Sequence, residues 1–154
     1  EPWRTWQGVA SWDGRSHQQG DTAAAVAADR DEHPAVAWVR YPGLADDAAR
    51  AVAERVCTAA APTRYGAMVS FGVTGGRTAA RTVCESTAMI RFLANVGDVA
   101  SLIIHPATTT HAALDADAQV AAGVRPEQLR LSVGLEGADA ICADLDAALA
   151  EADA

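Results

Sequence analysis

The chain has 154 residues and no lysine: all 12 of its basic residues are arginine. Its side chains therefore cannot provide a lysine amine, either as a nucleophile or as the anchor of a carbonyl cofactor. Aspartate and glutamate together number 20, so the formal net charge at pH 7 is −8. Nucleic-acid surfaces need clustered positive charge, and this balance argues against one.

Long apolar runs are also missing. No stretch of about 18 apolar residues is present, so we expect no membrane span. The opening stretch, EPWRTWQGVASWDGR, lacks the apolar centre of a secretion signal. The three cysteines, Cys57, Cys84 and Cys142, are odd in number and have no CxxC spacing. These features predict reduced thiols, no zinc site and a cytoplasmic protein.

What remains is an ordinary globular composition. Hydrophobic residues make up 50% of the chain and charged residues 21%. The length suits one domain with an adequate core. Much of the apolar content is alanine, which predicts a thin core packed largely by helices.

Hydrophobic periodicity predicts alternating helices and strands from residue 21 onward. Nothing in their order demands parallel crossovers. A loop containing Pro62 is expected over Thr58–Arg64. Strands are predicted at Ala35–Tyr41, Gly66–Val73, Ser101–His105 and Leu129–Val133, and helices at 21–32, Asp46–Cys57, Arg77–Met89, Asp115–Ala122 and Ala138–Ala152.

Residues 1–20 show neither helical nor strand periodicity, although they contain three of the four tryptophans. We interpret this stretch as an arm or divergent segment, separate from a domain that spans residues 21–154. The following helix would begin at a cap formed by Asp21 or Thr22.

Two polar residues stand out in the last two predicted strands. Arg130 alternates with Leu129 and Leu131, so its side chain must leave the opposite face of the strand. A guanidinium offers planar donors that match a carboxylate bidentately. Ser101 heads the preceding strand. The spacing alone fits an anion site and fits equally a surface charge on a half-buried strand.

Four motifs in a fixed order resemble the C-terminal part of the pyridoxal-phosphate-dependent enzymes of cysteine and methionine metabolism. Among these enzymes the chain is most like the O-acetylhomoserine sulfhydrylases, and the resemblance runs from His33 to the C-terminus. The motifs are NVGD at Asn95–Asp98, SLIIHPATTTH at Ser101–His111, AAGV at Ala121–Val124 and RLSVGLE at Arg130–Glu136.

This resemblance implies the small domain of a fold-type I enzyme, in the α/β class. Such a domain has a mainly antiparallel sheet of about four strands, with helices packed on one face. The other face docks on a larger domain. The resemblance also implies that Ser101 and Arg130 bind the α-carboxylate of an amino-acid substrate.

The complete enzyme would replace the γ-acetoxy group of O-acetylhomoserine by sulfide. Because this chain has no lysine, pyridoxal phosphate would be held by an N-terminal domain outside it. Two alternatives stay open: a non-catalytic interaction or small-ligand-binding module that covers its sheet by self-association, and the equivalent domain of a cystathionine synthase or lyase.

Other conspicuous residues have simpler interpretations. The glycine-rich stretch from Gly72 to Arg77 favours a tight turn over a phosphate cradle, because it lacks the lysine of a P-loop. His105 and His111 lack a third metal ligand and favour structural hydrogen bonds. The acids of the last helix, Asp144, Asp146 and Glu151, favour a solvated face.

Overall fold

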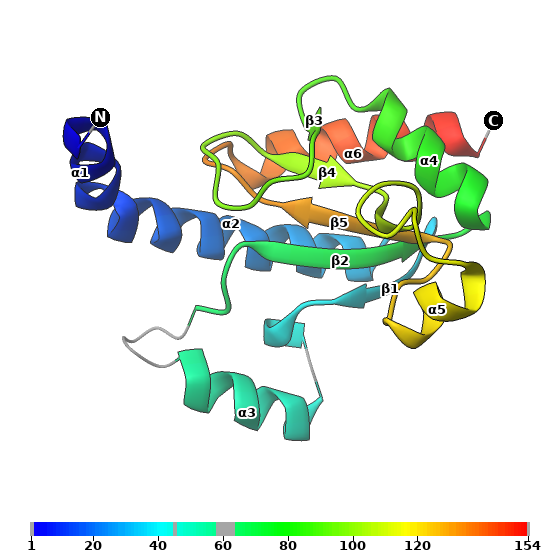
Figure 1. Ribbon diagram of the computed structural model, residues 1–154, viewed down its shortest axis with the longest axis horizontal. Coiled ribbons are helices and arrows are strands. Elements are labelled where there is room, and N and C mark those ends of the chain that lie inside the picture. The colour runs from blue at the N-terminus through cyan, green and yellow to red at the C-terminus, as the bar shows by residue number, and fades with distance from the viewer. Residues whose placement is uncertain (1, 45, 58–63, 154) are drawn as a thin grey trace.

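The computed structural model describes residues 2–44, 46–57 and 64–153. Its centre is a five-stranded sheet in the order β1-β2-β5-β4-β3 (Figure 1). Neighbouring strands are antiparallel, apart from the parallel pair β3 and β4. The strands are β1 (Val36–Arg40), β2 (Met68–Val73), β3 (Arg91–Phe92), β4 (Leu102–Ile104) and β5 (Gln128–Ser132).

Three long helices, α2, α4 and α6, pack against one face of this sheet and against each other. Helix α3 lies beyond the edge strand β1, and α5 lies near the ends of β4 and β5 (Figure 1). None of the described helices is long and apolar enough to cross a bilayer. The helices are α1 (Pro2–Ala10), α2 (Trp12–Asp31), α3 (Asp47–Cys57), α4 (Gly76–Ser86), α5 (Ala116–Ala121) and α6 (Ala138–Ala152), with short 3-10 turns η1 (Pro42–Leu44) and η2 (Pro106–Thr108).

The predicted fold class, a mixed α/β domain with a mainly antiparallel sheet, is confirmed. The sheet has five strands rather than four, because the two-residue strand β3 is too short to leave a periodic signal. Helix α6 has the predicted bounds, and α5 begins at the predicted cap, where Asp115 accepts a hydrogen bond from the Ala118 N–H. Of the predicted loop Thr58–Arg64, only Arg64 lies within the described residues.

The absence of regular structure predicted for residues 1–20 is wrong. This stretch forms α1 and the first half of α2, and the cap predicted at Asp21 or Thr22 falls inside a continuous helix. Glycines and polar residues conceal the helical period here. Helix α2 is stabilised by one buried face, which includes Gln19, Ala23 and Val26, as expected where packing outweighs propensity.

The core follows from the alternation of the two central strands. Val69 and Phe71 of β2 and Leu129 and Leu131 of β5 point to the helical face and are fully buried. They meet small side chains of α2 and α4 and the apolar stripe of α6, which is Ile141, Leu145, Ala148 and Leu149. Several of the buried side chains of α2 and α4 are alanines, so part of the alanine-rich composition goes into the core.

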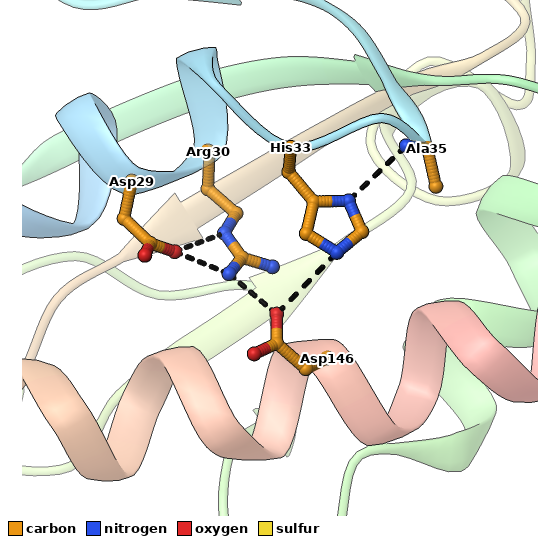
Figure 2. A network of polar contacts seen from close by, with 5 residues as sticks. All are labelled: Asp29, Arg30, His33, Ala35 and Asp146. Carbon is orange, nitrogen blue, oxygen red and sulfur yellow. Dashed lines mark hydrogen bonds and ion pairs between the residues drawn. The ribbon is translucent and has the colours of Figure 1, made fainter.

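A charged residue lies where α2 meets α6. Arg30 is only 1% exposed, and its guanidinium bridges Asp29 on its own helix and Asp146 on α6 (Figure 2). The distance to Asp146 is 2.5 Å. His33 lies 3.6 Å from the same carboxylate and accepts a hydrogen bond from the Ala35 N–H. A buried charge needs such partners, because an unpaired one would be strongly destabilising.

A second carboxylate of α6 holds the turn between α4 and β3. Asp144 accepts hydrogen bonds from three consecutive backbone N–H groups, those of Ala88, Met89 and Ile90, at 2.8 to 3.1 Å. The prediction that the acids of α6 form a solvated face is therefore wrong for Asp144, whereas Asp146 is 52% exposed and still forms its ion pair with Arg30. Both partners are distant in sequence, so helical spacing could not reveal them.

We predict that Asp144→Ala destabilises the fold by about 1–3 kcal/mol, because three N–H groups lose their acceptor and two of these hydrogen bonds are partly buried. The control is Glu151→Ala on the same helix, which should change the free energy of unfolding by less than about 0.5 kcal/mol. Urea unfolding of both variants measures the difference. Equal stabilities would contradict the role given to Asp144.

All three cysteines are free thiols, as the sequence predicts. Cys84 is buried in α4, and burial raises its pKa to about 12. Burial, with the neighbouring Asp29, raises the pKa of Cys142 to about 11. Neither thiol is ionised near neutral pH, so both are poor nucleophiles in the folded chain.

We therefore expect iodoacetamide at pH 8 to modify Cys57 first and to leave Cys84 unmodified until the chain unfolds. Mass spectrometry of peptides from native and urea-denatured samples tests this order. Denatured, unreduced protein should show three reactive thiols, and a finding of one would reveal a disulfide.

Candidate functional site

Arg130 lies in the middle of β5, on the face of the sheet opposite the three long helices. It pairs with Ser70 of β2 on one side and with Ile104 of β4 on the other. Its side chain is half-buried, and among the described residues no carboxylate or other acceptor pairs with its guanidinium. The alternative of a surface charge satisfied by an acid of the same chain therefore finds no support in this part of the structure.

Ser101 is completely buried just before β4. Its hydroxyl donates to Glu136 Oε2 at 2.8 Å and accepts from the Gly134 N–H at 2.9 Å. The N–H of Ser101 donates to the other oxygen of the same carboxylate, also at 2.9 Å. Its hydrogen bonds thus tie the start of β4 to the segment that follows β5.

Gly134 is required at this junction. A Cβ atom there would collide with the Glu136 carboxylate and with the backbone of Ala100 and Ser101. The glycine in the VGLE end of the fourth motif is therefore explained by the close approach of the Ala100–Ser101 backbone. Sequence analysis singled out Ser101 but missed Glu136, whose partner is 35 residues away.

The NVGD motif forms the loop between β3 and β4. Gly97 has a positive φ of 76°, and its N–H lies 3.4 Å from the Ser132 hydroxyl. The loop is fixed on α2, where the Gln19 amide donates to the Asp98 carbonyl at 2.6 Å. Gln18 likewise donates to the Leu135 carbonyl at 2.9 Å. The segment interpreted as an arm thus contributes residues that hold the family motifs in place.

A tryptophan and two arginines lie beside Arg130 on the same face. Trp38 of β1 covers Gly72, where any Cβ would collide with its indole. The Trp38 Nε1–H donates to Glu127 at 2.9 Å. The guanidinium carbons of Arg40 and Arg125 lie 5.1 and 5.3 Å from the centre of the indole ring, within the range of a cation–π contact.

The two histidines of the SLIIHPATTTH motif make structural hydrogen bonds. His105 is fully buried; its Nε2 donates to the Pro126 carbonyl at 2.7 Å and its Nδ1 accepts from the Thr108 hydroxyl at 2.8 Å. The Pro126 carbonyl fixes a proton on Nε2, and burial lowers the pKa of His105, which favours the neutral imidazole. Among the described residues, no group of three or more potential ligands could hold a metal ion.

The glycine-rich stretch after β2 is a tight turn, as predicted. Gly75 and Gly76 have φ values of 85° and 70°, which favour glycine, and α4 begins at once. The Arg77 guanidinium donates a hydrogen bond to the side-chain oxygen of Gln119 at 3.3 Å.

One apolar cavity lies away from the motifs. It has a volume of about 740 Å³ and lies between β1 and α3, with mainly apolar walls that include Tyr41, Val52 and Val56. A smaller hollow of about 250 Å³ joins Trp12 and Arg15 of α2 to Val96 of the NVGD loop. Neither of these two hollows is lined by Arg130 or Ser101.

Comparison with known proteins assigns the chain to a family. A sequence profile described as Cys/Met metabolism PLP-dependent enzyme matches residues 1–150. The chain belongs to this family. The match includes residues 1–20, which the motif resemblance, beginning at His33, did not reach.

Among curated relatives, an O-acetyl-L-homoserine sulfhydrylase of Leptospira meyeri is 40% identical over 96% of this chain and 33% of its own length. Among solved structures, cystathionine gamma synthase of Xanthomonas oryzae pv. oryzae in complex with cystathionine superposes with a TM-score of 0.84. It is 37% identical over 96% of this chain and 37% of that one. The chain thus spans about a third of the length of the relatives it matches.

The family name implies pyridoxal phosphate, and this chain's residues do not suit its covalent attachment. A Schiff base needs a lysine amine, and the chain has none. A solved family structure from Campylobacter jejuni contains the cofactor as pyridoxyl-lysine monophosphate and superposes with a TM-score of 0.85, over 94% of this chain and 33% of that one. We therefore assign no cofactor contact to this chain.

The buried His105 generates a pH-dependent prediction. Burial lowers its pKa, so the folded chain keeps it neutral where the unfolded chain, with a pKa of about 6.5, binds a proton. The folded state then binds fewer protons, and its stability falls as the pH drops below about 6.5 toward the lowered folded value.

We expect His105→Gln, which keeps a side-chain donor, to flatten this dependence while lowering stability at pH 7.5. Urea unfolding of both proteins between pH 7.5 and 5 measures this pH dependence, with His17→Gln, at a partly exposed position of α2, as the control. A parallel loss of stability in wild type and His105→Gln would exclude a buried neutral imidazole.

Proposed function

We propose that this chain is the C-terminal, substrate-carboxylate-binding domain of an O-acetylhomoserine sulfhydrylase-like enzyme. The observation that carries the proposal is Arg130: a half-buried arginine on the open sheet face, inside a family motif, with no partner among the described residues. Such a guanidinium has its planar donors free for an amino-acid carboxylate. The relatives matched over nearly the whole chain support the choice of substrate class.

Ser101 would serve the same site indirectly. Its hydroxyl is occupied by Glu136 and Gly134, so direct contact with a substrate would require breaking one of these hydrogen bonds. We propose that it fixes the segment after β5, and with it the position of Arg130 four residues before Gly134. This indirect role replaces the direct contact between Ser101 and the substrate carboxylate that the family resemblance implied.

The remaining parts of the reaction would come from a lysine-bearing domain in the rest of the enzyme. Pyridoxal phosphate, when bound there, supplies the electron sink that permits replacement of the γ-acetoxy group by sulfide. Apolar side chains suited to docking are exposed on α1, at the start of α2 and along the segment from β3 to β4. Helix α1, which has no buried residue, is the best candidate for an arm. These exposed residues are Trp3, Trp6, Trp12, Phe92, Leu93, Val96 and Val99.

Self-association through the same residues is an alternative way to cover them. A metabolic enzyme of this kind would act in the cytoplasm. Cystathionine synthesis is the second candidate reaction, favoured by the 37% identity to the Xanthomonas enzyme over almost the whole chain.

The test is a chimera in which this chain replaces the matching third of the Leptospira meyeri enzyme. We expect it to convert O-acetylhomoserine and sulfide to homocysteine. Arg130→Ala should lower kcat/KM by about 10- to 150-fold, since a charged bidentate hydrogen bond contributes roughly 1.5–3 kcal/mol. Arg130→Lys should lower kcat/KM by much of the same factor, because lysine keeps the charge without the planar donors.

The matched control is Arg81→Ala, which removes an exposed arginine paired with Glu85 on the opposite side of the domain. Full activity of the Arg130→Ala chimera would refute the carboxylate role. Offering cysteine in place of sulfide separates the two reactions, because only a cystathionine synthase would form cystathionine efficiently.

A further inference from the structure

The loop between β3 and β4, residues 93–100, is not held in place by buried side chains. The residues from Leu93 to Gly97 are all exposed, and Val99 is 55% exposed. A hollow of about 250 Å³ lies between this loop, the start of β2 and the first half of α2. Because packing does little to fix the β3–β4 loop, its position depends on hydrogen bonds.

Some of these hydrogen bonds join the loop to the segment that follows β5. The Leu135 N–H donates to the Val99 carbonyl at 2.8 Å. At the end of the loop, Glu136 accepts hydrogen bonds from the N–H and the hydroxyl of Ser101. The β3–β4 loop and residues 133–136 are thus tied to each other, and we call them the loop pair.

Helix α2 holds the loop pair through two consecutive glutamines. The Gln19 amide donates to the Asp98 carbonyl at 2.6 Å, and the Gln18 amide donates to the Leu135 carbonyl at 2.9 Å. Gln18 is exposed, so water can replace its hydrogen bond at little cost. Gln19 is only 5% exposed, and loss of its hydrogen bond would leave shielded polar groups without a partner. Gln19 is therefore the stronger anchor.

The loop pair reaches the face of the sheet from which Arg130 projects. The Gly97 N–H lies 3.4 Å from the hydroxyl of Ser132, which is two residues after Arg130 on β5. Residues two apart on a strand project from the same face. Ser132 and its partner Leu102 on β4 are buried there, whereas Arg130 is half-buried. The loop therefore covers the end of this face that borders Arg130.

We propose that Gln19 is a positioning residue of the carboxylate site. By holding the Asp98 carbonyl, it sets how the β3–β4 loop lies beside Arg130, and the loop in turn forms a wall of the space that a substrate carboxylate enters. This role rests on the proposed function, because it requires that Arg130 binds the carboxylate. Gln19 acts only through the loop and touches no reacting atom.

The first test is hydrogen exchange in the 154-residue chain, which requires no activity. Gln19→Met keeps the length of the side chain and removes its N–H donors. It should speed exchange of the Ser101 and Leu135 amide hydrogens by about 3- to 10-fold, because the loop pair opens more often without this hydrogen bond. The Met89 amide, which is bound by Asp144, should exchange as in wild type. Unchanged exchange, or equal acceleration of all three amides, would overturn the proposal.

The second test uses the chimera with the Leptospira meyeri enzyme. Gln19→Met should raise KM for O-acetylhomoserine by about 3- to 10-fold and change kcat by less than about twofold, because it disturbs binding of the carboxylate and not the chemical step. Gln18→Ala is the matched control on the same helix, and KM should stay within about twofold of wild type.

Asp144→Ala is the control for stability. This variant destabilises the fold without touching the loop pair, so KM measured well below its unfolding temperature should equal that of wild type. An unchanged KM in Gln19→Met, a fall in kcat alone, or an equal rise of KM in Asp144→Ala would each overturn the positioning role.

These outcomes are distinct from failure of the proposed function. Full activity of the Arg130→Ala chimera would refute the carboxylate role, and the positioning role of Gln19 would fail with it. If Arg130→Ala lowers kcat/KM while Gln19→Met leaves KM unchanged, only the positioning role fails.

Discussion

The pairing of β2 with β5 at the centre of the sheet is the constraint on which both the core and the site depend. In this register Phe71 lies opposite Leu129, and Ser70 lies opposite Arg130. The first pair is buried against the helices, and the second faces the open side. A slip of one residue would exchange the faces and drive a guanidinium into the apolar core, so the hydrophobic pattern that folds the domain also fixes where its arginine projects.

The ends of the sheet are held by a different kind of interaction. Glu136 binds both the N–H and the hydroxyl of Ser101, and Asp144 binds three N–H groups before β3. Both carboxylates come from the last part of the chain and satisfy backbone donors of segments 35 to 56 residues earlier. Buried donors must find acceptors, and in an acidic chain carboxylates are the available ones. The acidity of this domain is therefore partly structural.

Periodicity was informative wherever one face of an element is apolar over several turns or pairs. It located β1, β2, β4, β5 and α6, and it predicted that Arg130 faces away from Leu129. It failed for α2, where buried alanines and a buried glycine alternate with polar residues and give no apolar stripe. It also could not show that Arg30 is buried, because burial of a charge depends on Asp146, which lies 116 residues away. Partners distant in sequence, including Glu136 for Ser101, need the fold before they can be recognised.

The arginines of the described residues differ in what they bond to. Arg30 is buried and bound to two carboxylates, which its burial requires. Arg64 and Arg81 form ordinary exposed ion pairs, which contribute little to stability. Arg40, Arg125 and Arg130 have no carboxylate partner among the described residues, although the chain carries eight more negative than positive charges. The same holds for arginines elsewhere that bond to neutral groups, such as Arg50 and Arg77. In the proposed function, Arg130 is the arginine of this group that would receive the substrate carboxylate, because its guanidinium is half-buried in the sheet and has no acceptor among the described residues.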